Sequence, residues 1–249
     1  GLQKITSGTV SINGYDIKKN FVKAIAKVGC IVESPDVYMY LSGYDNLKLQ
    51  ASMYKDVTED DIIRVITLVG LENRIYDKVS KYSLGMRERL GIAIALLNSP
   101  NLLILDEPTN GLDPEGIKDL RELLKKLAKS GIGILISSHN LSELESFCNR
   151  VCIMAKGEIL EDNTIENIQG LNEHKYIIKT KNTKIIPKNF LKDCHIIDDN
   201  YFEVLKEEPE IALFIKKLVL KDIPIYEIKR TSLSLEEIFI TKAGGNKIA

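Results

Sequence analysis

Two adjacent carboxylates, Asp106 and Glu107, follow directly after the apolar run Leu102–Leu105. Pro108 comes next and ends the extended segment. A short apolar run that stops at such a residue is typical of a strand buried in a parallel sheet, and open α/β sheets bind ligands at the carboxyl ends of their strands. One carboxylate can hold magnesium while its neighbour orients or deprotonates a water. Without further motifs, a strand end with two solvated acids would explain the pair equally well.

Two flanking segments support a site for an anion. Ser83 and Gly85 open a segment whose later part, Leu90–Leu97, is apolar and helix-forming. A serine N-cap leaves backbone N–H groups and the positive end of the helix dipole available to a phosphate, although the spacing alone fits an ordinary capped helix equally. Downstream, residues 133–138 are expected to form a second buried strand, and His139 at its end could contact a phosphate.

In their order and spacing, these segments resemble the ATP-binding cassette (ABC) ATPases. Residues 82–86, YSLGM, are similar to the family's signature sequence, and the LLILDE segment resembles its Walker B strand. The resemblance makes Asp106 the magnesium-associated acid and Glu107 the catalytic glutamate. Residues 111–113 match the D-loop, which includes Asp113, and His139 matches the switch histidine.

The resemblance implies ATP and Mg²⁺ as cofactors and two kinds of protein partner. One is a second ATP-binding subunit, paired head to tail so that Ser83 and Gly85 of one subunit face the ATP held by the other. The second is a set of transmembrane permease subunits, which would keep this chain on the cytoplasmic face of the cell membrane. The implied activity is an ATPase coupled to transmembrane transport.

Glu33 stands where most relatives carry the glutamine of the Q-loop. An acid there is similar to the exporters of bacitracin and lantibiotics, so the resemblance implies a peptide-antibiotic exporter with Glu33 near magnesium and nucleotide. A carboxylate keeps an oxygen acceptor but lacks the amide donor. The alternative is that Glu33 arose by neutral drift, at a position that tolerates either glutamate or glutamine. At the level of the whole chain, the alternatives are an inactive ABC fragment and a non-transport ABC ATPase.

The sequence contains no GxxxxGK[ST] phosphate loop. Its first residues resemble the stretch just after the helix that follows this loop, and there is no initiator methionine. We therefore expect the chain to be a piece of a longer protein, lacking a beginning of roughly 30 residues or more. As printed, it should bind ATP weakly or not at all, because the lysine and the backbone cradle for the phosphates are missing.

The fold class expected is α/β: a P-loop-NTPase-like ABC nucleotide-binding domain with a helical subdomain and a small C-terminal α+β appendage. We place the ATPase domain at residues 1–169, its helical subdomain at about 44–97 and the accessory region at 170–249. In that last region, helical spacing of apolar residues predicts a helix over 210–220, and Ser234 with Glu237 predicts a capping box.

Composition excludes several other classes. A formal net charge of −1 provides no electrostatic footprint for nucleic acid, so no nucleic-acid partner is expected. The sequence contains no run of about 18 apolar residues, the length that a helix needs to span a bilayer. The four cysteines are scattered along the chain, do not complete a zinc site and are expected to be reduced thiols.

Overall fold

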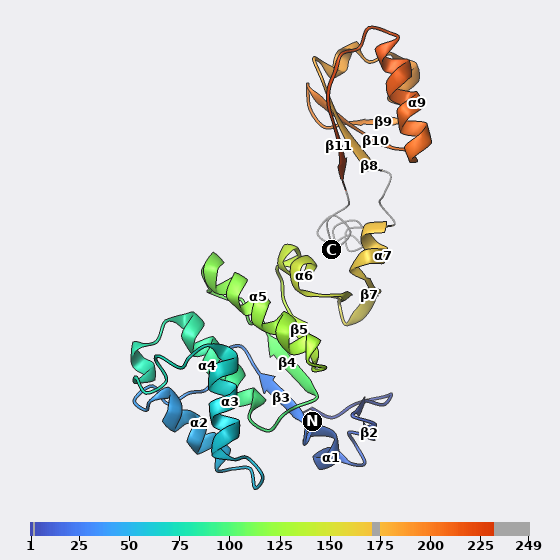
Figure 1. Cartoon of the computed structure of the whole chain (residues 1–249). Coiled ribbons are helices and arrows are strands. Elements are labelled where there is room, and N and C mark those ends of the chain that lie inside the picture. Colours follow the sequence, from blue (N-terminus) through green and yellow to red (C-terminus); the bar gives the residue numbers. More distant parts are fainter. Residues whose placement is uncertain (2, 171–174, 232–249) are drawn as a thin grey trace. The chain divides into compact units, whose positions relative to one another are not determined.

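The computed structural model describes residues 1, 3–170 and 175–231, and these fall into two compact units, residues 1–139 and 140–249 (Figure 1). Each unit is described by itself. None of the described helices is long and apolar enough to cross a bilayer.

The first unit begins with a small antiparallel hairpin. Its strands are β1 (Ser11–Ile12) and β2 (Tyr15–Asp16), and helix α1 (Phe21–Ile25) follows. Asn13 and Gly14, between the strands, have φ values of 52° and 80°. Two consecutive positive φ values are those of a type I′ turn, which explains why the sequence carries Asn-Gly here.

Three parallel strands form the sheet of the first unit: β3 (Val28–Ile31), β4 (Leu102–Asp106) and β5 (Gly133–Ser137), in the order β3-β4-β5. One face of this sheet packs on helix α4. Gly29 lies on that face, and a Cβ there would come within 2.5 Å of a backbone oxygen of α4. Leu103 and Leu105 share this face and are almost fully buried. The strand expected over residues 102–105 is therefore confirmed.

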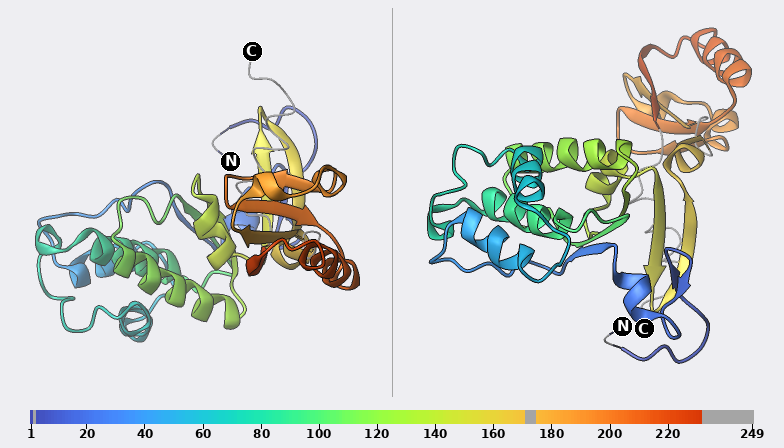
Figure 2. Two further views of the ribbon diagram at one scale, coloured as in Figure 1. Left: turned by 90° about the horizontal axis from the view of Figure 1, so that it is seen from above. Right: turned by 60° about the horizontal axis from the view of Figure 1, so that its bottom comes forward.

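Helices α2 (Gly43–Ala51), α3 (Glu59–Val69) and α4 (Leu84–Leu96) pack on one another beside this sheet (Figures 1 and 2). They occupy the range expected to be helical, with the short 3₁₀ helix η1 (Val79–Lys81) between the last two. Thr58 and Asp61 form a reciprocal capping box at the start of α3. A threonine followed three residues later by an acid, directly before an apolar run, is the sequence pattern of such a box.

Helix α5 (Pro114–Lys129) follows β4, packs against β5, and buries four leucines of its amphipathic face. An ion pair between Arg89 of α4 and Asp119 of α5 joins the two helices. The expectation that residues 133–138 form a buried strand is wrong in one respect. Strand β5 forms, but it lies at the edge of the described sheet, and Leu135, on the face away from α4, is 59% exposed.

The second unit opens with helix α6 (Leu141–Phe147) and an antiparallel pair, β6 (Arg150–Ala155) and β7 (Glu158–Thr164), followed by α7 (Ile165–Gly170). The remaining elements form a four-stranded antiparallel sheet in the order β11-β8-β10-β9, together with two helices and a 3₁₀ turn. Their bounds are β8 Lys175–Thr180, η2 Thr183–Ile185, α8 Lys188–Leu191, β9 Cys194–Ile196, β10 Tyr201–Leu205, α9 Glu208–Val219 and β11 Ile225–Thr231.

This antiparallel sheet has a hydrophobic core of its own. Phe202, Ile178 and Leu218 are essentially inaccessible to solvent, and Phe190 packs edge-on against Phe214. The apolar stripe of the helix expected at 210–220 is thus core, as α9. The two compact units of the chain meet between residues 139 and 140. The expected boundary between an ATPase domain and an accessory region, at residues 169 and 170, stays a prediction. The capping box expected at Ser234 lies outside the described residues.

Candidate functional site

The carboxyl ends of β3, β4 and β5 meet at one edge of the parallel sheet. Ile31 of β3 is level with Leu105 of β4, and Leu105 is level with Ile136 of β5. Glu33, Glu107 and His139 each follow two or three residues after these positions. The topology therefore places all three residues at the same edge, which is where parallel sheets bind ligands.

Glu107 and His139 are in direct contact at this edge. The His139 Nδ1 atom lies 2.9 Å from the Glu107 Oε2 atom. The Glu107 side chain is 26% exposed and the His139 side chain 75% exposed, so the pair is open to a ligand and to water. The Glu107 backbone has a φ of 49°, a left-handed conformation that is uncommon for a residue other than glycine. The chain therefore turns sharply at Glu107, directly after the strand.

Ser137 contacts the Asp106 carboxylate and the Glu107 backbone, a role that the sequence analysis did not assign to it. Its hydroxyl donates a short hydrogen bond to Asp106 Oδ1 and accepts the backbone N–H of Glu107 at 3.1 Å. The Ser137 carbonyl lies 3.2 Å from the same N–H. The last residue of β5 thus holds both the acidic side chain and the turn that follows it. Ser137 could have been found by aligning the two parallel strands, because that alignment places it level with Asp106.

Replacing Ser137 with alanine should lower ATP hydrolysis about tenfold, because one hydrogen bond to a charged group is worth roughly 1.5 kcal/mol. The apparent Mg²⁺ requirement should rise, since Asp106 would lose the group that orients it. Steady-state ATPase assays over a Mg²⁺ titration, in a chain that includes a phosphate loop, measure both effects. Ser137→Thr keeps the hydroxyl and should restore most of the activity. A parental Mg²⁺ profile in the alanine variant would contradict this positioning role.

Ser83 and Asp113 both begin helices. The Ser83 hydroxyl accepts the Met86 N–H at 3.2 Å at the start of α4, which confirms the N-cap. Asp113 accepts the Gly116 N–H at 2.8 Å at the start of α5, with Pro114 in the first turn. In this chain, the structure therefore shows both residues as helix caps, and their roles toward a nucleotide stay predictions.

The beginnings of these two helices also touch. Gly111 has a φ of 74°, and a Cβ there would lie 3.0 Å from Leu84 Cδ2. A Cβ on Gly85 would lie 3.8 Å from Leu112 Cδ2. Glycine therefore suits position 111 through its backbone conformation, and a side chain there would also crowd Leu84.

Glu33 lies at the same edge of the sheet but does not join the Glu107–His139 pair. It is exposed, has a φ of 57° and, within the part of the chain that the structure describes, forms no hydrogen bond or ion pair. Like Glu107, it marks a sharp backbone turn after a strand. Its approach to a metal or nucleotide stays a prediction.

The residues of this edge suit a magnesium nucleotide better than a metal held by protein alone. Among the described residues, no group of three or more His, Cys, Asp or Glu side chains could hold a metal ion. Magnesium is usually held by one or two carboxylates together with phosphate oxygens and water. Asp106, already oriented by Ser137, provides such a carboxylate.

Comparisons with known proteins agree with this arrangement. A family model described as ABC transporter matches residues 1–110. The uncharacterized ABC transporter ATP-binding protein YhcH of Bacillus subtilis is 42% identical over 248 residues, which cover 99% of this chain and 81% of that protein. The chain belongs to the ABC transporter ATP-binding proteins.

This ABC protein is also similar to a bacitracin transport protein and to a solved ABC structure. The bacitracin transport ATP-binding protein BcrA of Bacillus licheniformis is 37% identical over 254 residues, covering 100% of this chain and 83% of the relative. A solved structure of the ATP binding subunit of an ABC transporter has a TM-score of 0.59 and 31% identity, covering 69% of this chain and 72% of that one. The expected P-loop-NTPase-like α/β fold is thereby confirmed.

Proposed function

We propose that this protein is the ATP-binding and hydrolysing subunit of an ABC exporter for peptide antibiotics of the bacitracin or lantibiotic type. The observation that carries the proposal is the contact between Glu107 and His139 beside Asp106, at the carboxyl edge of the parallel sheet. The substrate class is supported by the similarity to the bacitracin transport protein and by the acid at position 33.

Each side chain at the edge has a distinct task in this proposal. Asp106, oriented by Ser137, would hold magnesium, which when bound neutralises charge on the phosphates. Glu107 would orient the attacking water and accept its proton. His139 lies against Glu107 through Nδ1 and its side chain is largely exposed, so it would hold the Glu107 carboxylate and contact the terminal phosphate.

The remaining site residues would act in a head-to-tail pair of subunits. Ser83 and Gly85, at the N-terminus of α4, would present backbone N–H groups and the positive end of the helix dipole to the ATP of the other subunit. Asp113, in the D-loop, would meet the other subunit close to the same nucleotide. Association with permease subunits would hold the protein at the cytoplasmic face of the cell membrane.

Glu33 would couple the nucleotide to the permease, as a residue near magnesium. Its exposed side chain and sharp backbone turn place a carboxylate outside the sheet, where it can contact a partner. Glu33→Gln keeps an oxygen acceptor and removes the charge, so ATP hydrolysis should change little. Glu33→Ala removes the acceptor and should weaken both hydrolysis and transport.

The experiment is a peptide-antibiotic resistance assay in cells that carry the complete subunit together with its permease. Cells with the parental protein should survive a higher concentration of bacitracin or a lantibiotic than cells without it, and the Glu33→Ala cells should lose this advantage. Asp36→Ala, a change of another exposed acid three residues away, serves as the control. Resistance that is absent with the parental protein would overturn the substrate class. Full resistance with Glu33→Ala would overturn the coupling role.

A further inference from the structure

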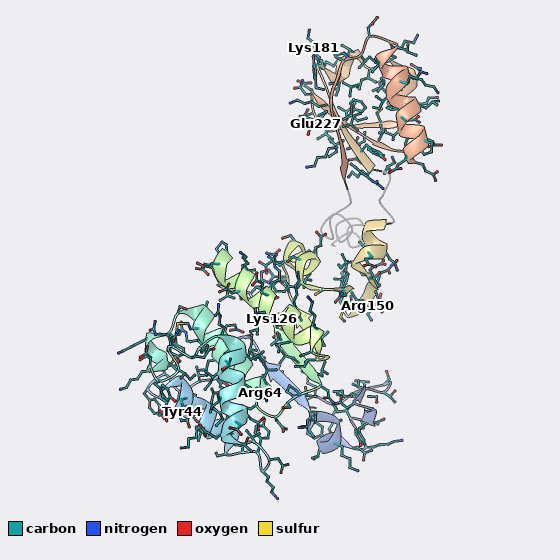
Figure 3. All side chains as sticks on the ribbon, in the orientation of Figure 1. Tyr44, Arg64, Lys126, Arg150, Lys181 and Glu227 are labelled. Carbon is teal, nitrogen blue, oxygen red and sulfur yellow. The ribbon has the colours of Figure 1, made fainter. Side chains whose placement is uncertain are left out.

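Arg89 connects three helices of the first unit through one guanidinium group. Arg89 itself belongs to α4, and its Nη2 atom pairs with the Asp119 carboxylate of α5. Its Nη1 atom lies 3.5 Å from the carbonyl oxygen of Val69, the last residue of α3, in a long hydrogen bond. Figure 1 shows these three helices, and Figure 3 marks Arg64 on α3 and Lys126 on α5. One side chain therefore contacts the end of α3 and the first half of α5.

The surroundings of this guanidinium suit a cation on both sides. The last carbonyl groups of a helix carry the negative end of its dipole, so a cation is favourable at the end of α3. Gly70 ends α3 with a φ of 71°, and a Cβ there would lie 3.5 Å from Arg89 Nη1. The Asp119 carboxylate provides a full opposite charge on the other side. A planar guanidinium reaches two such partners through different nitrogens, whereas the compact ammonium of lysine has no such fork.

The ion pair is a second point of contact between α4 and α5. Helix α4 packs on α2, α3 and β3, whereas α5 packs on β5. The beginnings of α4 and α5 already touch. Arg89 follows Ser83 by six residues, and Asp119 follows Asp113 by six residues, so the pair lies roughly 9 Å along each helix from its cap, at 1.5 Å per residue. Two separated contacts fix the angle between two helices, which a single contact at their beginnings does not.

We propose that Arg89 is a positioning residue for ATP hydrolysis, which through Asp119 holds α4 and α5 at the angle that lets both helix beginnings meet the nucleotide of the other subunit. This inference rests on the head-to-tail pairing of the proposed function, in which Ser83 and Gly85 of α4 and Asp113 of α5 face that nucleotide. Arg89 contacts neither the nucleotide nor the attacking water. Its loss leaves each helix intact but lets one helix beginning tilt away from the ATP of the other subunit.

The role separates ATP binding by one subunit from the formation of the pair. In Arg89→Ala, the ATP affinity of a single subunit should stay unchanged, because that affinity comes from the subunit's own phosphate loop. An ion pair of this exposure contributes a factor of about three to five, and a symmetric pair of subunits contains it twice. The subunit concentration that gives half-maximal turnover should therefore rise about tenfold.

The experiment uses the complete subunit, in a chain that includes a phosphate loop, with ATP and Mg²⁺. ATP turnover per subunit is measured over a range of subunit concentrations, and binding of a fluorescent ATP analogue to dilute protein gives the affinity of the single subunit. Asp119→Ala removes the other partner of the ion pair and should shift the concentration dependence to a similar extent. The double variant R89A/D119A should shift it little further, because both changes remove the same contact.

Arg74→Ala is the matched control. Arg74 forms an ion pair with Asp77, but both residues lie in the segment between α3 and η1, so this pair connects no two helices. Its half-maximal concentration should equal that of the parental protein. Denaturant unfolding gives the folded fraction of each variant, since a purely structural role would lower turnover in proportion to that fraction at every subunit concentration.

The outcomes distinguish this inference from the proposed function. A parental half-maximal concentration in either Arg89→Ala or Asp119→Ala would overturn the inference, as would a loss of turnover that only follows the folded fraction. Turnover per subunit that does not depend on subunit concentration in the parental protein would instead contradict the head-to-tail pairing of the proposed function.

Discussion

Replacing Glu107 with glutamine is expected to lower ATP hydrolysis by about 10²–10⁴-fold, the usual contribution of a general base. The amide has nearly the same shape and can keep the contact with His139 Nδ1, which is 2.9 Å from the carboxylate in the parental protein. It cannot accept a proton from water. ATP binding should therefore persist while turnover stops, and an ATP-bound pair of subunits should accumulate.

The measurement is ATP turnover together with size-exclusion chromatography in the presence of ATP, in a chain that includes a phosphate loop. Glu115→Gln is the matched control, because Glu115 is an exposed acid in the first turn of α5. Its turnover should equal that of the parental protein. Parental turnover in Glu107→Gln would show that Glu107 is not the base, and the mechanism proposed for this edge would fail.

The stability of the first unit should fall as the pH rises toward 7, because of a buried acid in α4. Glu88 is only 6% exposed, and among the described atoms its Oε1 has no hydrogen-bond partner. Burial raises the pKa of the Glu88 carboxyl from 4.5 to about 7. The protonated form is therefore favoured in the folded protein, and the charged form is costly there.

The direction of the effect follows from the protons bound in each state. Between pH 4.5 and 7, folded Glu88 keeps a proton that the unfolded chain has lost, so the free energy of unfolding decreases as the pH rises. The loss is complete once the pH exceeds the folded-state pKa, and it amounts to about 3 kcal/mol at roughly 1.4 kcal/mol per pKa unit. Below pH 4.5, this group contributes no pH dependence.

Glu88→Gln removes the titration and keeps the shape. The variant and the parental protein should have similar stability near pH 4.5, whereas at pH 8 the variant should be more stable by about 3 kcal/mol. Denaturant unfolding at both pH values measures the difference. Glu72→Gln, a change of an exposed acid, should follow the parental protein. If the parental and Glu88→Gln stabilities changed in parallel with pH, the carboxyl would not be buried as described.

The local elements of this protein could be predicted where a few neighbouring residues determine the structure. The apolar run before Asp106 predicted β4, and Ser83 predicted the capped start of α4. In each case, burial or backbone conformation depends on residues within one turn or one strand.

The site could be predicted only in part, because its contacts depend on strand register. The sequence indicated Asp106, Glu107 and His139, but the role of Ser137 follows from its pairing with Asp106, 31 residues away. The exposure of Leu135 on β5 also depends on which neighbours cover each face. Among the described residues, the Glu33 side chain has no partner that would indicate its role, so the resistance experiment is needed to test that role.

The close approach of Leu84 to Gly111 connects the first residue of α4 to the loop between β4 and α5. Leu84 opens α4, and Gly111 lies four residues after Glu107 in the loop that leads to α5. A movement of the α4 N-terminus would therefore push directly on the loop that carries the acid. A shift at the start of α4 would thus reach the turn after β4 through a direct contact within one chain.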